Sequence, residues 1–150
     1  MTDIWRPHTT VAAVIEQAGK FLFVEEQADQ SIVLNQPAGH WESDETLTEA
    51  AIRETLEETG YHFQPTALIG VYRWPHPTQA IVYLRFAFCG AVLGHEANRA
   101  LDAGILRAVW LTADELRSQA ARHRSPLVMR CMQDYLAGKR YDLDLITHLN

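Results

Sequence analysis

The amino-acid sequence predicts an α/β protein, because segments typical of strands and of helices follow one another along its 150 residues. Apolar, β-branched stretches of strand length lie on both sides of a central segment, residues 39–61, whose second half has the composition of a helix. A later helix is predicted after a short apolar strand, where Thr112 and Glu115 have the spacing of a capping box. This alternation of strands and helices is that of the α/β class.

The first elements predicted are strands. Residues 9–16 (TTVAAVIE) are apolar and β-branched, and residues 17–20 have the composition of a tight turn. Residues 21–25 (FLFVE) follow as a second strand, so the two segments form a predicted β-hairpin. After another turn, residues 32–34 are a short strand, and residues 35–40 form a loop that leads to the central helix.

The central helix has recognisable ends in the sequence. We expect Ser43 or Asp44 to be its N-cap, because both side chains accept hydrogen bonds from the first turn of a helix. Gly60 is a natural residue just after the C-terminus, where the backbone often turns left-handed. Gly39, before the helix, would allow an unusual φ angle or the close approach of a ligand.

Three glutamates are crowded on one face of this helix. Glu54, Glu57 and Glu58 are spaced i, i+3 and i+4, and like charges at that spacing each cost about 0.2–0.5 kcal/mol on an isolated helix. Glu57 and Glu58 also lie in the last turn, where the helix dipole disfavours negative charge. The cluster is either a solvated acidic surface or a site for a divalent cation, and oxygen-only ligands favour Mg²⁺ or Mn²⁺.

Arg53 precedes the glutamates and is close to them in the helical register. Glu57 lies four residues after it and Glu49 four residues before it. A guanidinium can hold a carboxylate in a fixed orientation by a fork of two hydrogen bonds, which a lysine cannot do. Arg53 is therefore predicted to orient a carboxylate of the cluster.

Two further strands are predicted after the helix, at residues 67–73 and 80–88. A proline-rich loop, residues 74–78 (WPHPT), connects them. Trp74 and His76 of this loop are candidates to stack on or contact a substrate ring. The alternative is that Trp74 packs in the core, since tryptophan is mostly buried on average.

Residues 89–107 are the least regular stretch of the sequence, and loops of this length within a compact domain are often functional. They contain the carboxylates Glu96 and Asp102, which are either surface charges or additional site residues. Residues 108–111 then form a short strand before the capping box.

A basic turn, residues 122–126 (RHRSP), precedes the last predicted helix, residues 127–137. Cationic side chains beside a helix N-terminus are suited to bind phosphate. Arg124 and Ser125 are therefore candidate substrate-binding residues. The alternative is a solvated basic loop that offsets the acidic remainder of the chain.

Length and composition limit the classes of function. The length and the 47% hydrophobic residues are those of a single globular domain. A net charge of −6 argues against binding a nucleic-acid polymer through its backbone. Cys89 and Cys131 are isolated, which predicts neither a zinc site nor a disulfide framework. No signal peptide or apolar run of membrane-spanning length is apparent, so we expect a cytoplasmic protein.

The central segment resembles the signature of the Nudix hydrolases. Gly39 is followed after five residues by Glu45, and after seven more by residues 53–61 (RETLEETGY). Every Gly, Glu and Arg of the signature is present, and Thr55 departs from the usual apolar type. The resemblance implies an α/β/α sandwich with a mixed β-sheet, expected to be monomeric. It also implies a Mg²⁺ or Mn²⁺ site whose ligands are the Gly39 carbonyl, Glu54, Glu57 and Glu58.

A closer resemblance is to the branch of this family called the NudJ phosphatases. It is carried by residues 6–12 (RPHTTVA), 35–40 (NQPAGH), 124–128 (RSPLV) and 138–141 (GKRY). It implies Mg²⁺-dependent hydrolysis of small phosphoanhydrides, namely hydroxymethylpyrimidine pyrophosphate, thiamine pyrophosphate and nucleoside di- and triphosphates, with release of phosphate. In this family an additional carboxylate commonly comes from a later loop, and here Glu96 or Asp102 would supply it as a further ligand or base.

The mechanism expected from these residues is metal-assisted hydrolysis without a covalent intermediate. Glu57 is our candidate for the group that accepts the proton of the attacking water, and Arg53 would hold it in place. Two alternatives stay open at this point. One is a hydrolase of the same family that removes nucleoside triphosphates or nucleoside diphosphate-linked compounds. The other is a catalytically silent domain that senses a nucleotide or binds a protein.

Overall fold

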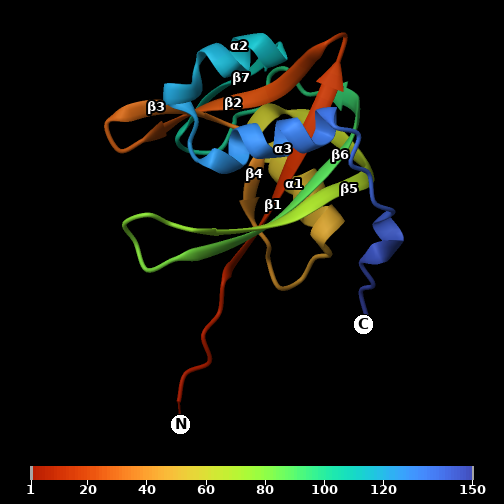
Figure 1. Ribbon diagram of the computed structural model, residues 1–150. Helices are drawn as coiled ribbons and strands as arrows, with labels where there is room; N and C mark the ends of the chain where they lie inside the picture. The colour runs from red at the N-terminus through yellow and green to blue at the C-terminus, as the bar shows by residue number, and fades with distance from the viewer. Residues whose placement is uncertain (1, 150) are drawn as a thin grey trace.

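The structure, a computed structural model, describes residues 2–149, in which helices cover both faces of a mixed β-sheet (Figure 1). The strands run in the order β3-β2-β1-β6-β5, with β4 paired to β1 and β7 paired to β2. Among the strand pairs of residues 2–149, only β1–β6 is parallel. The strands are β1 (His8–Gln17), β2 (Lys20–Ala28), β3 (Ser31–Asn35), β4 (Ala38–His40), β5 (Tyr61–Pro75), β6 (Val82–His95) and β7 (Ile105–Leu111).

The helices are divided between the two faces of the sheet. They are α1 (Leu47–Thr59), α2 (Ala113–Ser118) and α3 (Pro126–Leu136), with single 3₁₀ turns at Ala120–Arg122 and Leu143–Leu145. Helix α1 lies on one face, and α2 and α3 lie on the other (Figure 1). The predicted α/β/α sandwich is therefore confirmed.

Strand β1 is the centre of both cores. Val11, Ala13 and Ile15 pack in the cluster beneath α1, whereas Ala12 and Val14 pack in the cluster beneath α2 and α3. Because successive side chains of a strand point to opposite faces, a strand covered on both sides needs an unbroken apolar run. This double burial explains the composition of the first predicted strand.

Helix α1 begins later than we predicted. Its N-cap is Thr46, and neither Ser43 nor Asp44 has this role. Thr46 forms a capping box with Glu49: the threonine hydroxyl accepts from the Glu49 N–H, and the Glu49 carboxylate accepts from the Thr46 N–H. The reciprocal pair satisfies two N–H groups of the first turn, which a single Ser or Asp cap cannot do. The predicted end at Gly60 is confirmed, with φ of 77°.

Strands β5 and β6 are longer than the sequence indicated. They form an antiparallel pair from Tyr61↔His95 to Pro75↔Val82. The first part of the stretch predicted to be irregular, up to His95, is therefore strand. A loop follows before β7, and the Asp102 N–H donates to the Glu57 carbonyl at 3.0 Å. This bond places the loop against the end of α1.

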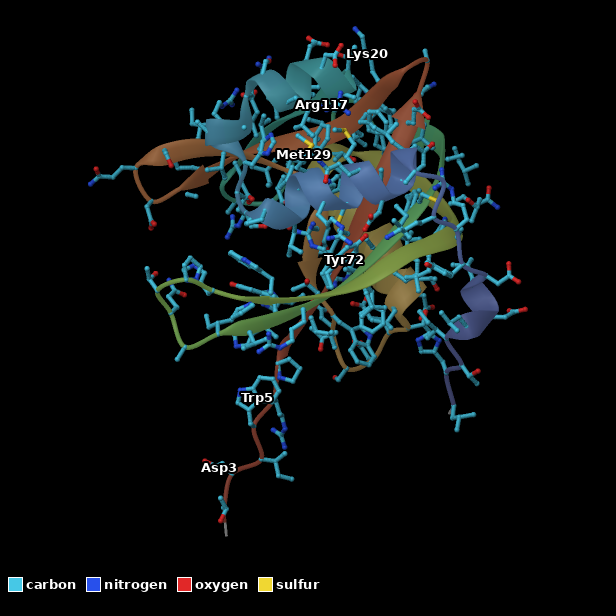
Figure 2. All side chains as sticks on the ribbon, viewed as in Figure 1. Asp3, Trp5, Lys20, Tyr72, Arg117 and Met129 are labelled. Carbon is cyan, nitrogen blue, oxygen red and sulfur yellow. The ribbon has the colours of Figure 1, made fainter. Side chains whose placement is uncertain are left out.

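Residues 2–7, which precede β1, extend away from the sandwich. Figure 2 shows Asp3 and Trp5 on this segment, clear of the rest of the fold. Ile4 and Trp5 are 78% and 66% exposed. Within residues 2–149, no helix has the length and apolar composition needed to cross a membrane.

Candidate active site

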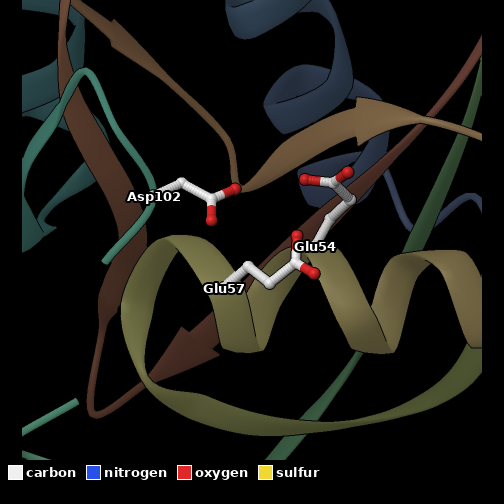
Figure 3. Close-up of side chains that lie close together, drawn as sticks. All are labelled: Glu54, Glu57 and Asp102. Carbon is white, nitrogen blue, oxygen red and sulfur yellow. The ribbon is translucent and has the colours of Figure 1, made fainter. Parts of the chain in front are cut away.

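Three carboxylates from two segments meet at the C-terminal half of α1. Glu54 and Glu57 project from the helix, and Asp102 approaches them from the loop before β7 (Figure 3). One carboxylate oxygen of each residue lies within 4.8 Å of those of the other two. Oxygens this close repel one another unless protons or a cation lie among them, so the arrangement suits a hard divalent ion.

Glu58 lies beside this group and is more deeply buried. Its Oε1 accepts a hydrogen bond from the Ala38 N–H at 3.0 Å. Burial raises the pKa of Glu58 to about 8, and the nearby Glu54 carboxylate acts in the same direction. Burial likewise raises the pKa of Glu54 to about 7, against the opposing effect of Arg53. Without a cation, both groups tend to retain a proton near neutral pH.

Arg53 connects the carboxylates to the segment that precedes α1. Its Nε and Nη2 donate to the two oxygens of Glu45 at 2.9 and 2.7 Å. Its Nη1 donates to Glu54 at 2.8 Å and to Glu57 at 3.2 Å, and Nη2 also donates to the His40 carbonyl at 3.0 Å. The hydrogen bond with Glu45 raises the pKa of Arg53. One guanidinium therefore fixes the positions of three carboxylates and of the end of β4.

Gly39 is the central residue of β4 and pairs with Val11 of β1. This pairing holds β4 next to α1, so that Gly39 lies against the Glu54 side chain. The structure therefore places Gly39, Glu54, Glu57 and Glu58 together. This is the set that the family signature implies for the metal.

A cleft of about 850 Å³ opens beside these residues. Gly39, Glu54 and Glu58 lie on its wall. All four predicted substrate-binding residues also line it, namely Trp74, His76, Arg124 and Ser125. The cleft thus joins the acidic cluster to the residues expected to contact the organic part and the phosphate of a substrate.

The aromatic side of the cleft is formed by the β5–β6 hairpin. Trp74 and Tyr83 are stacked, with ring centroids 5.8 Å apart and an interplanar angle of 17°. His76 Nδ1 accepts from the backbone N–H groups of Thr78 and Gln79 at 3.2 and 3.1 Å. His76 therefore holds the turn of the hairpin and lines the cleft. Trp74 is partly exposed and lies outside the two core clusters.

The basic side of the cleft is formed by the start of α3. Arg124 pairs with Glu26 at 2.7 Å, and its backbone N–H donates to the Leu34 carbonyl. Ser125 is the N-cap of α3, and its Oγ accepts from the Leu127 N–H at 3.1 Å. Because its oxygen is used as the cap, Ser125 retains its hydroxyl proton as a donor.

The two acidic candidates of the later loop have different surroundings. Asp102 is in the carboxylate group, whereas Glu96 bonds to His62 at 2.6 Å and to Arg99 at 3.4 Å. Glu96 therefore takes part in a surface ion-pair network and does not face Glu54 or Glu57.

Arg85 lines the same cleft and was not among the candidates from the sequence. It is only 5% exposed, although it lies in an otherwise apolar strand, β6. A charged residue within the run VYLRFAF was the available signal, because arginine is rarely buried without a partner.

The donor set fits a divalent cation of the Mg²⁺ type. The group consists of carboxylates, to which the signature adds the Gly39 carbonyl, and both cysteines of the chain are buried in the core. Hard oxygen ligands at one end of a polar cleft are the usual surroundings of Mg²⁺ bound with a phosphate substrate.

Comparison with known proteins gives one family. The model of the NUDIX domain matches residues 6–131. Phosphatase NudJ of Escherichia coli (strain K12) is 42% identical over 147 residues, covering 98% of this chain and 95% of that protein. The protein of the same name from Shigella flexneri has the same identity and coverage.

Solved structures give the same result. A NUDIX hydrolase from Nitrosomonas europaea is 50% identical with a TM-score of 0.94, and the match covers 96% of this chain and 98% of that one. A UDP-X diphosphatase, at 20% identity and a TM-score of 0.74, shares the fold; 94% of this chain and 68% of that one are covered.

Proposed function

This chain belongs to the Nudix hydrolases, which hydrolyse phosphoanhydrides, and from that premise we propose that it cleaves the diphosphate of small organic molecules with the help of Mg²⁺. The observation that carries the proposal is the meeting of Glu54, Glu57 and Asp102 beside the cleft, whose wall includes Glu54. The cleft also offers aromatic and basic side chains, as a substrate with a ring and a phosphate requires.

Mg²⁺ would be held by the Gly39 carbonyl and by Glu54, Glu57 and Glu58, with Asp102 as a further ligand. A cation held there would offset the negative charge of the diphosphate and make a water molecule easier to deprotonate. Mn²⁺ prefers similar ligands and would substitute for Mg²⁺. The raised pKa values of Glu54 and Glu58 support this set, because a bound cation would offset the cost of burying their negative charges, which is the main reason that they retain a proton.

Glu57 accepts the proton of the attacking water in this proposal. It is the most accessible of the three signature glutamates, with 32% of its side chain exposed. Arg53 limits the orientations of Glu57 through the 3.2 Å contact and holds Glu54 at 2.8 Å. Attack on one phosphorus expels the other phosphate, and the positive charges of the site stabilise the negative charge that develops.

The cleft positions the remainder of the substrate. Trp74 and Tyr83 provide a stacked aromatic surface on which a pyrimidine or thiazole ring can lie. Arg124 and the Ser125 hydroxyl would donate to phosphate oxygens at the start of α3. The 42% identity to Phosphatase NudJ supports the resemblance to that branch. We therefore propose the substrates that this resemblance implies, namely hydroxymethylpyrimidine pyrophosphate, thiamine pyrophosphate and nucleoside di- and triphosphates.

A substrate panel tests this proposal. The purified protein is assayed with these compounds, measuring kcat/KM with orthophosphate and pyrophosphate release recorded separately. We expect orthophosphate release that requires Mg²⁺ and stops in excess EDTA. Preference for a nucleoside triphosphate with pyrophosphate release would instead assign the enzyme to the removal of nucleotides. Absence of turnover with every compound would favour the silent binding domain. Light scattering and cell fractionation check the monomeric state and the cytoplasmic location that we also propose.

A further inference from the structure

The floor of the cleft contains a buried arginine without an acidic partner. Arg85 Nη1 donates to Gln36 Oε1 at 3.1 Å, and Nη2 donates to Asn35 Oδ1 at 3.2 Å. The Nε–H is buried and has no hydrogen-bond acceptor among residues 2–149. Both amide partners are neutral, so the hydrogen bonds position the guanidinium without neutralising it.

Two ionisable side chains of α3, Cys131 and Asp134, do not neutralise Arg85. Cys131 Sγ lies 3.8 Å from Nη1, but burial raises the pKa of this thiol and keeps it neutral. Asp134 accepts from the Tyr72 hydroxyl and forms ion pairs with Arg130 and Lys139. Arg85 itself forms no ion pair within the part of the chain that is described.

An arrangement of this kind costs free energy in the ligand-free protein. An arginine keeps its charge even when buried, and a buried charge is tolerated when it is paired. The missing counterion is therefore expected to come from outside the chain. Since Arg85 lines the cleft, a ligand in the cleft can provide it.

Pairing in the sheet connects Arg85 through β1 to β4, the strand whose Gly39 contacts Glu54. Arg85 pairs with Thr10 of β1, which on its other side pairs with His40 of β4. Paired residues of neighbouring strands share a face of the sheet, so these three side chains point to the same side. Asn35 and Gln36, which hold the guanidinium, belong to the segment that leads directly into β4.

We propose that Arg85 binds a phosphoryl oxygen of the substrate, and that the substrate diphosphate is the counterion of this buried guanidinium. The diphosphate would lie between the carboxylate-bound cation and Arg85, with its organic group toward Trp74 and Tyr83. This inference rests on the proposed function and assigns it a substrate-binding residue. A buried guanidinium held in a fixed orientation favours a dianionic phosphate over a neutral ligand.

The test compares Arg85→Gln and Arg85→Lys with the wild-type enzyme. Steady-state kinetics with Mg²⁺ and thiamine pyrophosphate give kcat and KM, and calorimetry gives the affinity for orthophosphate in the same buffer. For Arg85→Gln we expect KM to rise and phosphate affinity to fall by about 10- to 100-fold, as for the loss of a charge-assisted hydrogen bond. The KM and phosphate affinity of Arg85→Lys should lie between those of the wild type and of Arg85→Gln, because lysine keeps the positive charge but cannot form the two-pronged hydrogen bonds of a guanidinium.

The matched control is Arg73→Gln on the neighbouring strand β5. It removes the same charge from an exposed position outside the cleft, and should leave KM unchanged. Wild-type KM and phosphate affinity in Arg85→Gln would overturn the inference. The two proposals fail separately: a wild-type protein that cleaves no diphosphate but binds phosphate through Arg85 refutes only the proposed function.

Asn35→Asp keeps the proposal testable if the Arg85 variants do not fold. This change places a carboxylate where the Asn35 amide oxygen accepts from Arg85, and so supplies the missing counterion within the chain. We expect a melting temperature at or above that of the wild type and a raised KM, because the new carboxylate competes with the substrate. An unchanged KM in this folded variant would refute the role of Arg85 in phosphate binding.

Discussion

Gly39 and Glu54 are in such close contact that no side chain fits between them. A Cβ atom at Gly39 would lie 2.1 Å from the Glu54 carboxyl carbon and 2.3 Å from each of its oxygens. The φ angle of Gly39 is not in the left-handed region, so its backbone conformation does not require a glycine. Glycine is required at this position because any side chain would collide with the Glu54 carboxylate. The two residues are proposed ligands of one cation, and their contact fixes the distance between them.

Gly39→Ala should therefore fold but lose metal affinity. The new methyl group must displace the Glu54 carboxylate, because the backbone of β4 is held by its pairing with β1. We expect the Mg²⁺ concentration for half-maximal turnover to rise by about 10–100-fold, the usual cost of disturbing a ligand. Gly94→Ala in β6 is the control, since a Cβ there meets nothing within 4 Å. Equal Mg²⁺ requirements in both variants would contradict this account.

Glu57→Gln should abolish most of the turnover with little effect on folding. The amide keeps the shape of the side chain but cannot accept a proton, so kcat should fall by about 100- to 10,000-fold. Steady-state kinetics and thermal melting of the variant measure the two effects. Asp114→Asn, which changes a carboxylate that is 96% exposed on α2, is the control. Full activity in Glu57→Gln would assign the proton transfer to another group.

Asp102→Asn and Glu96→Asn separate the two acidic candidates of the later loop. We expect Asp102→Asn to weaken Mg²⁺ binding, because Asp102 lies in the carboxylate group. Glu96→Asn removes surface contacts with His62 and Arg99, which contribute little to stability or turnover. Calorimetric titration with Mg²⁺ measures the difference. If Glu96→Asn were the more damaging change, the loop would have to rearrange when metal binds.

Arg53→Lys should reduce kcat although the charge is kept. A lysine cannot bond both oxygens of Glu45 and also reach Glu54, Glu57 and the His40 carbonyl. Loss of this positioning should lower kcat by up to about 100-fold. Arg99→Lys, at an exposed pair, is the matched control. A wild-type kcat in Arg53→Lys would show that catalysis does not need the guanidinium of Arg53 to bond several carboxylates at once.

Removing metal should make stability depend on pH through Glu58. Its pKa is about 8 in the folded protein and 4.5 as the reference value, so folding favours the protonated form. The stabilisation is fully present below pH 4.5 and is lost as the pH rises to about 8, because the unfolded chain ionises first. Denaturant unfolding in EDTA should therefore show stability falling across this range. Glu58→Gln should show a weaker fall, and parallel curves for the two proteins would refute the assignment.

Several features of the fold and site followed from local sequence alone. The i, i+3, i+4 spacing brings Glu54, Glu57 and Glu58 together on any helix, and Gly60 marks its end without help from other segments. The capping box of Thr112 and Glu115 was likewise predicted and is present. Each of these depends on residues within one or two helical turns, where helix geometry determines the distances.

Other features depended on contacts between distant segments and could not be predicted. Cross-strand pairing with Tyr61 extends β6 to His95, in a stretch that has no strong strand pattern of its own. The choice of Asp102 over Glu96 follows from one backbone hydrogen bond to Glu57. Burial of Arg85 beside Asn35 results from the packing of three strands. The short-range periodicity of the sequence determined which side chains could act, and sheet pairing decided which of them share a cleft, because pairing joins residues that are far apart in the chain.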